Sequence, residues 1–340
     1  MKKIIALLLV LSLSMFLTIG CGNNDPAPAA TNGGDATAED ANGEVADGEQ
    51  LTIAFSTKTI TDNEFQRIMV EGAQAAVEAA GHEFVLTLAG GELDVSAQIN
   101  NIEDLITMGV DGIIVVPMDG EAIVPVLRRA YEAGIPVVLA DSNIAAGNDE
   151  LYVTFVGTDN YEVGLEAAAR MIEAVGEGEV IMVRGASGSF AGDMRAEGFR
   201  DGLEGSSVTL ADEQAGNWMS EVAMQVTENM LQGHPNTAGI FLASDGMLPG
   251  VLSAVELQGL AGQLSIISVD GEQSALDQVD AGYLLGTVGQ FPGEIGATSV
   301  QVLLDVLTGA RAADSFERFM DSGLMFMYEG NMEESRRYAF

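Results

Sequence analysis

From residue 51 onward, short apolar runs alternate with longer stretches whose apolar residues recur every three or four positions. The short runs predict strands, and because they are almost unbroken they suit parallel sheets with helices on both faces. Strands are expected at 51–56, 83–88, 112–116, 136–140, 152–156, 179–184, 208–211, 239–243, 265–269 and 284–288. Helices are expected at 65–79, 95–108, 123–131, 161–175, 190–203, 219–231, 247–257, 274–279 and 295–307. This alternation predicts an α/β fold with parallel sheets, and so many strands predict two similar lobes.

The start of the chain has the pattern of an export signal. Lys2 and Lys3 give a basic beginning, and residues 4–19 form a Leu-rich apolar run that is short for a membrane span. Gly20 supplies the small residue that precedes a cleavage site. We therefore expect a signal peptide at 1–20 and a mature protein that works outside the cytoplasm.

The single cysteine of the chain, Cys21, follows this signal directly. The run Leu17-Thr18-Ile19-Gly20-Cys21 is similar to a bacterial lipobox, although Thr18 stands where Leu is more usual. An ordinary signal peptide and an uncleaved anchor helix are the alternatives. A lone cysteine in an exported chain has no disulfide partner, and acylation accounts for its presence. We expect lipid on Cys21 and attachment to the bacterial cell membrane.

The segment that follows is poor in large apolar residues. Residues 22–50 are mostly Ala, Gly, Asn, Asp and Glu, with two prolines. Such a composition buries too little surface to offset the entropy of ordering the chain. We interpret 21–50 as a lipidated cysteine followed by a disordered acidic spacer, with the folded body beginning at Leu51.

The charge of the chain restricts its partners. The formal net charge is −37, with 14 basic residues. Nucleic acid and anionic lipid are therefore excluded as electrostatic partners. The acidic residues are scattered along the sequence, so we interpret them as a solvated surface suited to salty or acidic surroundings. We expect a monomer.

Polar and aromatic residues follow the predicted strands, at the sheet edge where doubly wound folds bind ligands. Taken singly, an Asp or Ser there could cap the next helix, and an aromatic ring could belong to the core. Because such residues converge from both halves of the chain, we take them together as a binding site. The candidates are Asn63, Phe65, Asp141, Ser142, Arg195, Trp218, Asp245, Asp270 and Gln290.

Several motifs, in their order and spacing, resemble the type I periplasmic binding proteins of the ribose-binding branch, the solute receptors of ABC importers. The resemblance runs from Leu51 to about Gly330. The motifs are Gly109-Val110-Asp111-Gly112-Ile113-Ile114-Val115, Ala133-Gly134-Ile135-Pro136-Val137-Val138, Gly157-Thr158-Asp159-Asn160, Arg195-Ala196-Glu197-Gly198-Phe199, Ser268-Val269-Asp270-Gly271 and Gly289-Gln290-Phe291-Pro292.

The resemblance implies two Rossmann-like lobes joined by three crossovers that act as hinges. A small neutral sugar or polyol would bind in the cleft, the lobes would close on it, and the permease subunits of an ABC importer would receive it. The crossovers would fall near Thr158, Gln290-Phe291 and Asp321-Ser322, so that the N-terminal lobe comprises 51–157 and 291–321 and the C-terminal lobe 158–290 and 322–340.

The family's ribose site, carried over residue by residue, falls on Asn63, Phe65, Asp141, Arg195, Trp218, Asp270 and Gln290. Carboxylates, amides and an Arg fork suit vicinal hydroxyls, and aromatic rings suit the apolar faces of a sugar. Three positions depart from the family pattern. Ser142 replaces a common Arg, Gln66 a second aromatic residue and Ser244 an Asn, so ribose itself does not follow. Lys58 and the Asp141-Ser142 pair are similar to autoinducer-2-binding relatives.

Three other classes of protein are alternatives: an enzyme, a sugar-responsive repressor and a signal receptor. With only His82 and His234 and with Cys21 assigned to lipid, no metal site, cofactor site or nucleophilic triad can be identified, so an enzyme is not expected. A sugar-responsive repressor of the same fold would need an N-terminal helix-turn-helix, and the signal stands there instead. A receptor that passes a sugar or autoinducer-2-like signal to a membrane sensor stays an alternative to transport.

The lipid on Cys21 is open to a direct test. Because two or more acyl chains anchor a protein to a membrane and one holds it only marginally, Cys21→Ser should move the protein from the detergent-rich phase to the aqueous phase. Phase partitioning followed by immunoblotting would measure this. Equal recovery of both proteins in the aqueous phase would contradict lipidation.

Overall fold

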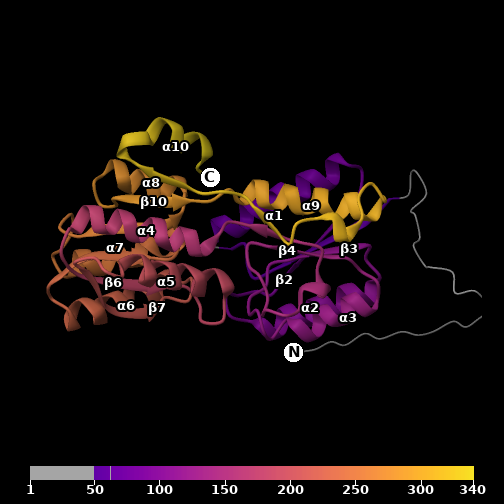
Figure 1. Ribbon diagram of the computed structural model, residues 1–340, viewed down its shortest axis with the longest axis horizontal. Coiled ribbons are helices and arrows are strands. Elements are labelled where there is room, and N and C mark those ends of the chain that lie inside the picture. Colours follow the sequence, from indigo (N-terminus) through magenta and orange to yellow (C-terminus); the bar gives the residue numbers. More distant parts are fainter. Residues whose placement is uncertain (1–49, 62) are drawn as a thin grey trace, which may run out of the picture. The chain divides into compact units, whose positions relative to one another are not determined.

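The computed structural model describes residues 50–61 and 63–340. The predicted signal peptide, Cys21 and all but the last residue of the predicted spacer lie outside the described residues. The strands form two six-stranded sheets, and the expected α/β fold with two parallel-sheet lobes is confirmed (Figure 1). We call the first sheet with its helices the first lobe, and the second sheet with its helices the second lobe.

The first lobe is built on a sheet that is parallel throughout. In spatial order its strands are β11 (Phe319–Asp321), β5 (Phe155–Gly157), β4 (Val137–Ala140), β3 (Gly112–Val115), β1 (Thr52–Thr57) and β2 (Glu83–Leu88). Helices α1 (Glu64–Ala79) and α9 (Pro292–Leu307) cover one face, and α2 (Val95–Met108) and α3 (Val124–Glu132) cover the other (Figure 1). Successive strand residues bury into opposite faces, as Ile53 and Ala54 do, which is why the strands are apolar throughout.

The second lobe repeats this plan with one difference. In spatial order its strands are β12 (Met325–Tyr328), β10 (Gly286–Gly289), β9 (Ser265–Asp270), β8 (Thr237–Leu242), β6 (Gly178–Arg184) and β7 (Val208–Ala215). Helices α4 (Asn160–Val175) and α5 (Phe190–Leu203) pack on one face. Helices α6 (Ser220–Gly233), α7 (Leu248–Leu257) and α8 (Gln273–Asp280) pack on the other. β12 runs antiparallel to β10, so this sheet is not wholly parallel.

The C-terminal part of the chain contains elements that the apolar pattern did not indicate. These are β11, β12, the helix α10 (Met332–Tyr338) and the 3₁₀ turns Ala313–Ser315 and Glu329–Asn331. β11 and β12 have only three and four residues, too few to show a period. The strand expected at 152–156 is also shorter than predicted, because the 3₁₀ turn Asp149–Leu151 precedes it and the regular ladder begins only at Phe155.

The chain passes from one sheet to the other three times. It leaves the first lobe after β5, returns between β10 and α9, and leaves again between β11 and β12. Two of these passages are bonded to each other. The Thr158 and Ser322 hydroxyl oxygens lie 3.0 Å apart, and the Ser322 N–H donates to the Gly157 carbonyl at 2.8 Å.

Both lobes contain helices in unusually close contact at glycines, as α1 and α9 in the first lobe and α4 and α5 in the second show. In the first lobe, a Cβ at Gly296 of α9 would lie 2.1 Å from the Met69 carbonyl oxygen of α1. In the second, a Cβ at Gly198 of α5 would lie 2.1 Å from the Tyr161 carbonyl oxygen of α4. These glycines are needed because the backbones approach too closely for any side chain. One helix of each pair, α1 in the first lobe and α5 in the second, contributes residues to the candidate site described below.

We predict that Gly198→Ala destabilises the protein, because the new methyl group must push α4 and α5 apart. Overpacking of this kind costs about 1–3 kcal/mol. Urea denaturation would measure the loss. Gly233→Ala is the control: it lies at the end of α6, nothing lies within 4 Å of its added Cβ, and it should leave stability unchanged or slightly raised.

Candidate functional site

A cavity of about 350 Å³, its mouth included, lies between the two lobes. The first lobe lines it with Lys58, Asn63, Phe65, Gln66 and Asp141, and the second lobe lines it with Ser189, Ala191, Arg195, Trp218, Ser244 and Asp270. These residues follow the carboxyl ends of strands or begin the next helices, where open α/β sheets bind ligands. The lobes also touch beside the cavity, where the Gly120 N–H donates to the Gly188 carbonyl at 3.3 Å.

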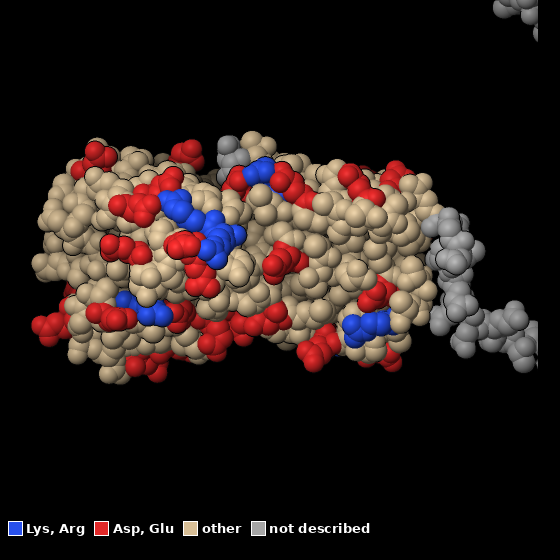
Figure 2. All heavy atoms as spheres, turned by 90° about the horizontal axis from the view of Figure 1, so that it is seen from above, with Lys and Arg blue, Asp and Glu red and all other residues tan. Residues whose placement is uncertain are grey.

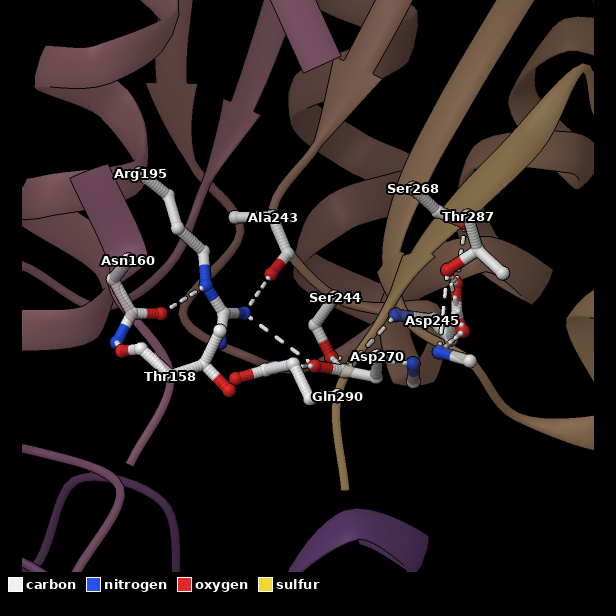
Figure 3. A network of polar contacts seen from close by, with 12 residues as sticks. Thr158, Asn160, Arg195, Ala243, Ser244, Asp245, Ser268, Asp270, Thr287 and Gln290 are labelled. Carbon is white, nitrogen blue, oxygen red and sulfur yellow. Dashed lines mark hydrogen bonds and ion pairs between the residues drawn. The ribbon is translucent and has the colours of Figure 1, made fainter. Parts of the chain in front are cut away.

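Arg195 is the organising residue of the second-lobe wall. It lies in α5, one turn in from the N-terminus, and only 3% of it is exposed. Its Nε donates to the Asn160 side-chain oxygen at 2.8 Å, and one terminal nitrogen donates to the Ala243 carbonyl at 2.5 Å (Figure 3). The same nitrogen lies 3.5 Å from the Asp270 carboxylate. The guanidinium is therefore fixed from three sides before any ligand arrives.

The carboxylate of Asp270 accepts from several donors at the end of β9. The Gln290 amide donates to one oxygen at 2.8 Å, and the Ser244 hydroxyl donates to the other at 2.7 Å (Figure 3). Burial raises the pKa of Asp270, while Arg195 and the Ser244 hydroxyl act in the opposite direction. Its φ of 127° is rare outside glycine, and such backbone strain is typical of functional sites.

Asp245 was expected to bind ligand, but the structure places it behind Asp270 and outside the cavity lining. Its carboxylate accepts from the backbone N–H groups of Gly271 and Glu272 at 2.8 and 2.9 Å and from the hydroxyls of Ser268 and Thr287 (Figure 3). Burial and the nearby Asp270 raise its pKa well above the ordinary value. These hydrogen bonds hold the loop after β9 in place, and the Asp245 carboxylate therefore contacts protein groups rather than the cavity.

Asp141 is the counterpart of Asp270 on the first lobe. It directly follows β4 with a φ of 62°, and its N–H donates to the Val156 carbonyl at 2.9 Å. Burial raises the pKa of its carboxyl, and the charges of Lys58 and Arg195 oppose the shift. The next residue, Ser142, is buried but does not line the cavity; its N–H donates to the Ala140 carbonyl in a tight turn. The turn brings only one of the two predicted residues to the site.

Trp218 forms an aromatic wall on the second lobe. It and Asn217 have φ values of 62° and 56°, so the loop after β7 turns sharply to aim the indole at the cavity. A Cβ at Gly185 would lie 2.2 Å from the ring, which explains the glycine at that strand end. Two cations flank the indole: the Lys58 ammonium lies 5.0 Å from a ring centre and the Arg195 guanidinium 5.9 Å.

Phe65 and Gln66 form the wall of the first lobe, in the first turn of α1. Phe65 is supported from behind by Phe340, with ring centroids 6.0 Å apart in an edge-to-face arrangement. The Gln66 side chain accepts from the Thr57 hydroxyl at 2.5 Å. The second aromatic residue that the family often has is thus replaced by an amide, which makes this part of the wall polar.

Lys58 and Asn63 complete the first-lobe half of the site, and both contact Glu92. The Lys58 ammonium lies 3.5 Å from one oxygen of Glu92, and the Asn63 amide donates to the other at 2.8 Å. Glu92 belongs to the loop between β2 and α2 and does not line the cavity itself.

The structure brings six of the nine predicted site residues to one cavity: Asn63, Phe65, Asp141, Arg195, Trp218 and Asp270. Gln290 is buried one layer behind, where it donates to Asp270. Five further lining residues were not among the candidates, namely Lys58, Gln66, Ser189, Ala191 and Ser244. Lys58, Ser189 and Ser244 also follow strands, so the rule that selected the other candidates applies equally to them. Gln66 and Ala191 belong to first turns of helices.

Two features, a metal-binding cluster and a membrane-spanning helix, are not found in the part of the chain that the structure describes. Within residues 50–61 and 63–340, no three His, Cys, Asp or Glu side chains are placed to hold a metal ion. In the same residues, no helix is both long and apolar enough to span a membrane.

The comparisons with known proteins agree with this geometry. The sequence model of the family described as periplasmic binding protein domain matches residues 53–311 of this chain. The D-ribose/D-allose-binding protein of Pseudomonas aeruginosa is 33% identical over 77% of this chain and 83% of its own length. The ribose import binding protein of Bacillus subtilis is 30% identical over 92% of this chain and 95% of its own. The chain belongs to the periplasmic binding protein family.

Solved structures of the same class share the fold. A solute-binding protein of an ABC transporter from Agrobacterium vitis, with bound D-fucose, superposes with a TM-score of 0.80 at 29% identity, covering 85% of this chain and 100% of that one. One from Actinobacillus succinogenes, with bound D-allose, superposes with a TM-score of 0.76 at 29% identity and the same coverage.

Glu272, which follows Asp270 and precedes α8, should make stability depend on pH. Burial and the nearby Asp270 raise its pKa from 4.5 to about 7. Because this pKa is higher in the folded protein than in the unfolded chain, the folded state holds an extra proton between those values. Rising pH through that window therefore lowers stability.

We predict that Glu272→Gln melts at a higher temperature than the wild type at pH 8, and that the gap narrows at pH 4.5. Thermal unfolding at the two pH values would measure it. Glu256→Gln, an exposed position on α7, should show no such pH-dependent gap. A Glu272→Gln gap of equal size at both pH values would contradict the assignment.

Proposed function

We propose that this protein captures a small neutral sugar or polyol in the cavity between its lobes and presents it to the permease subunits of an ABC importer. It is a sugar- or polyol-binding solute-binding protein of the ABC transporter class, works outside the cytoplasm and is not an enzyme. The observation that carries the proposal is the pair of buried carboxylates, Asp141 and Asp270, that line one cavity from opposite lobes.

The chemistry of the lining suits a polyhydroxylated ligand. Carboxylates accept from hydroxyl groups, while Arg195 and the amides of Asn63 and Gln66 donate to them. The rings of Phe65 and Trp218 give apolar walls against which C–H faces can pack. A few placed polar groups between apolar walls are the usual composition of a small-molecule site.

The charges of the lining favour a neutral ligand. Each of the two lining cations already has an acidic partner: Arg195 lies 3.5 Å from Asp270, and Lys58 lies 3.5 Å from Glu92. A charged ligand would bring a further buried charge that has no free partner in the lining, which is costly in a site of low dielectric. Neutral sugars satisfy the same groups through hydroxyls alone.

The ligands of similar proteins support a monosaccharide as one candidate within the class of neutral sugars and polyols. The relatives named for ribose and allose cover most of this chain, and the similar solved structures hold fucose and allose. We therefore propose a monosaccharide of five or six carbons. Gln66 in place of a second aromatic ring supports a ligand with a hydroxyl group toward the first lobe rather than a bare C–H face.

A second candidate function is reception of a furanose-like signal for a membrane sensor. The observation that favours it is that Lys58 and Asp141 line the same cavity. Ser142, the third residue of that resemblance, is turned away, so we rank this function below sugar import.

Closure of the lobes is part of the proposal. The proposed N-terminal lobe comprises 51–157 and 291–321, the C-terminal lobe 158–290 and 322–340, and the three passages between the sheets would serve as hinges. The bonds that join Thr158 to Ser322 support this, because they keep two passages together as one axis.

The setting of the molecule is also proposed. Lipid on Cys21 would hold a monomer at the outer face of the cell membrane, with 22–50 as a tether. On the face shown in Figure 2, acidic side chains are spread widely, and the few basic ones lie among them. On this face the distribution supports a solvated acidic surface rather than a surface that binds nucleic acid.

A panel of ligands would test the function. D-ribose, D-allose, D-fucose, D-arabinose, myo-inositol and a furanose-like autoinducer should be screened by thermal shift, and a neutral sugar or polyol should raise the melting temperature most. Asp270→Asn should then raise its Kd roughly ten- to a hundredfold, because lost buried hydrogen bonds cost about 1–3 kcal/mol.

Asp201→Asn is the control for that panel, since Asp201 lies at the exposed end of α5 and outside the cavity. It should leave the Kd unchanged. A panel in which only the autoinducer stabilises the protein would favour the signalling function. A best ligand that binds Asp270→Asn as tightly as the wild type would overturn the site.

A further inference from the structure

The carboxylate of Glu92 reaches two residues of the cavity without lining the cavity itself. One oxygen accepts from the Asn63 amide at 2.8 Å, and the other lies 3.5 Å from the Lys58 ammonium. The contact with Lys58 is shielded from water, since the two side chains are 11% and 9% exposed. The oxygen that faces Lys58 is fully buried and makes no hydrogen bond to another described residue, so the ammonium is its compensation.

The orientation of Asn63 depends on the same carboxylate. The Asn63 side-chain oxygen accepts from the Gln66 N–H at 2.9 Å, where it caps the start of α1. That bond fixes which end of the amide is the donor, and the donor end points to Glu92. One buried residue therefore sets the direction of two groups that a ligand would meet.

Lys58 also contacts the opposite lobe. Its ammonium lies 5.0 Å from the centre of a Trp218 ring and 3.5 Å from Glu92, so it has one partner on each lobe. A Lys side chain has four flexible bonds, and without a fixed partner its ammonium could swing toward Asp141. Glu92 keeps the charge at one place in the first-lobe wall.

We propose that Glu92 is a positioning residue that makes the site select neutral over anionic sugars. Among the described residues that line the cavity, Arg195 has a carboxylate within 4 Å, that of Asp270, and Lys58 has none; Glu92 supplies a partner for Lys58 from outside the lining. A ligand carboxylate then finds no uncompensated ammonium and meets the repulsion of Glu92, Asp141 and Asp270. A neutral hydroxyl still accepts from Lys58. This inference rests on the proposed function.

The test is a double-mutant cycle with Lys58→Met and Glu92→Gln. Gln keeps an acceptor for Asn63 but cannot pair with the ammonium. Urea unfolding should show coupling: Lys58→Met strands the Glu92 carboxylate, so adding Glu92→Gln should restore part of the lost stability. Additive effects on unfolding would overturn the pairing.

Calorimetry would supply the functional readout, with D-ribose and D-allose against D-ribonate and D-allonate. Glu92→Gln should lower the preference for the neutral sugar over its aldonate by roughly tenfold, as expected for loss of one buried charge contact. In the Lys58→Met background the same change should lower the preference by less, because only the repulsion from Glu92 itself is then removed. An unaltered preference in Glu92→Gln alone would overturn the proposal.

Glu103→Gln is the matched control, because Glu103 pairs with Arg129 on the exposed surface of the same lobe. It removes one negative charge, but it should show no coupling with Lys58→Met in unfolding and should not change the preference for the neutral sugar over its aldonate. If no sugar of the panel binds the wild type, the proposed function fails. The unfolding cycle would in that case still decide, without ligand, whether Glu92 holds Lys58.

Discussion

A buried guanidinium must find its partners inside the protein, and the partners of Arg195 tie together the parts of the second lobe that surround the cavity. Asn160 at the start of α4, the Ala243 carbonyl after β8 and Asp270 at the end of β9 all contact it (Figure 3). Asn160 in turn donates to the Thr158 carbonyl, and Gln290 donates to Asp270. Both of these residues stand where the chain crosses between lobes. A ligand that contacts Arg195 is therefore one hydrogen bond away from the first crossing, and a ligand that contacts Asp270 is one hydrogen bond away from the second.

Most of the fold follows from the sequence because its strands are covered on both faces. A residue such as Phe55 must be apolar whichever way it points, so the run 51–56 is recognisable without knowing its neighbours. β11 and β12 escape recognition because each takes its pairing from a distant strand rather than from a local pattern. The antiparallel direction of β12 follows from the third crossing, which no periodicity encodes.

The sequence predicts the edge of the sheet where the site lies more reliably than it predicts which individual residues line the site. The position after a strand places a side chain at the correct edge of the sheet, which suffices for Asp141 and Asp270. It does not give the direction of the side chain, and Asp245 follows β8 yet turns toward the loop after β9. Glu92 is harder still, since it follows the edge strand β2 and acts only through Lys58 and Asn63.

The two lobes differ in how firmly they hold their half of the cavity. The second lobe presents a guanidinium and a carboxylate that contact each other and several elements of that lobe. The first lobe also presents a carboxylate, but its cation is the flexible Lys58 side chain, which is held with the Asn63 amide by Glu92 of a loop. Among the residues that line the cavity, Trp218 is the one aromatic ring with a cation from each lobe near it. It is also the single tryptophan of the chain. Its indole emission, sensitive to nearby charge, makes the unlabelled protein an optical sensor whose signal comes from the binding site alone.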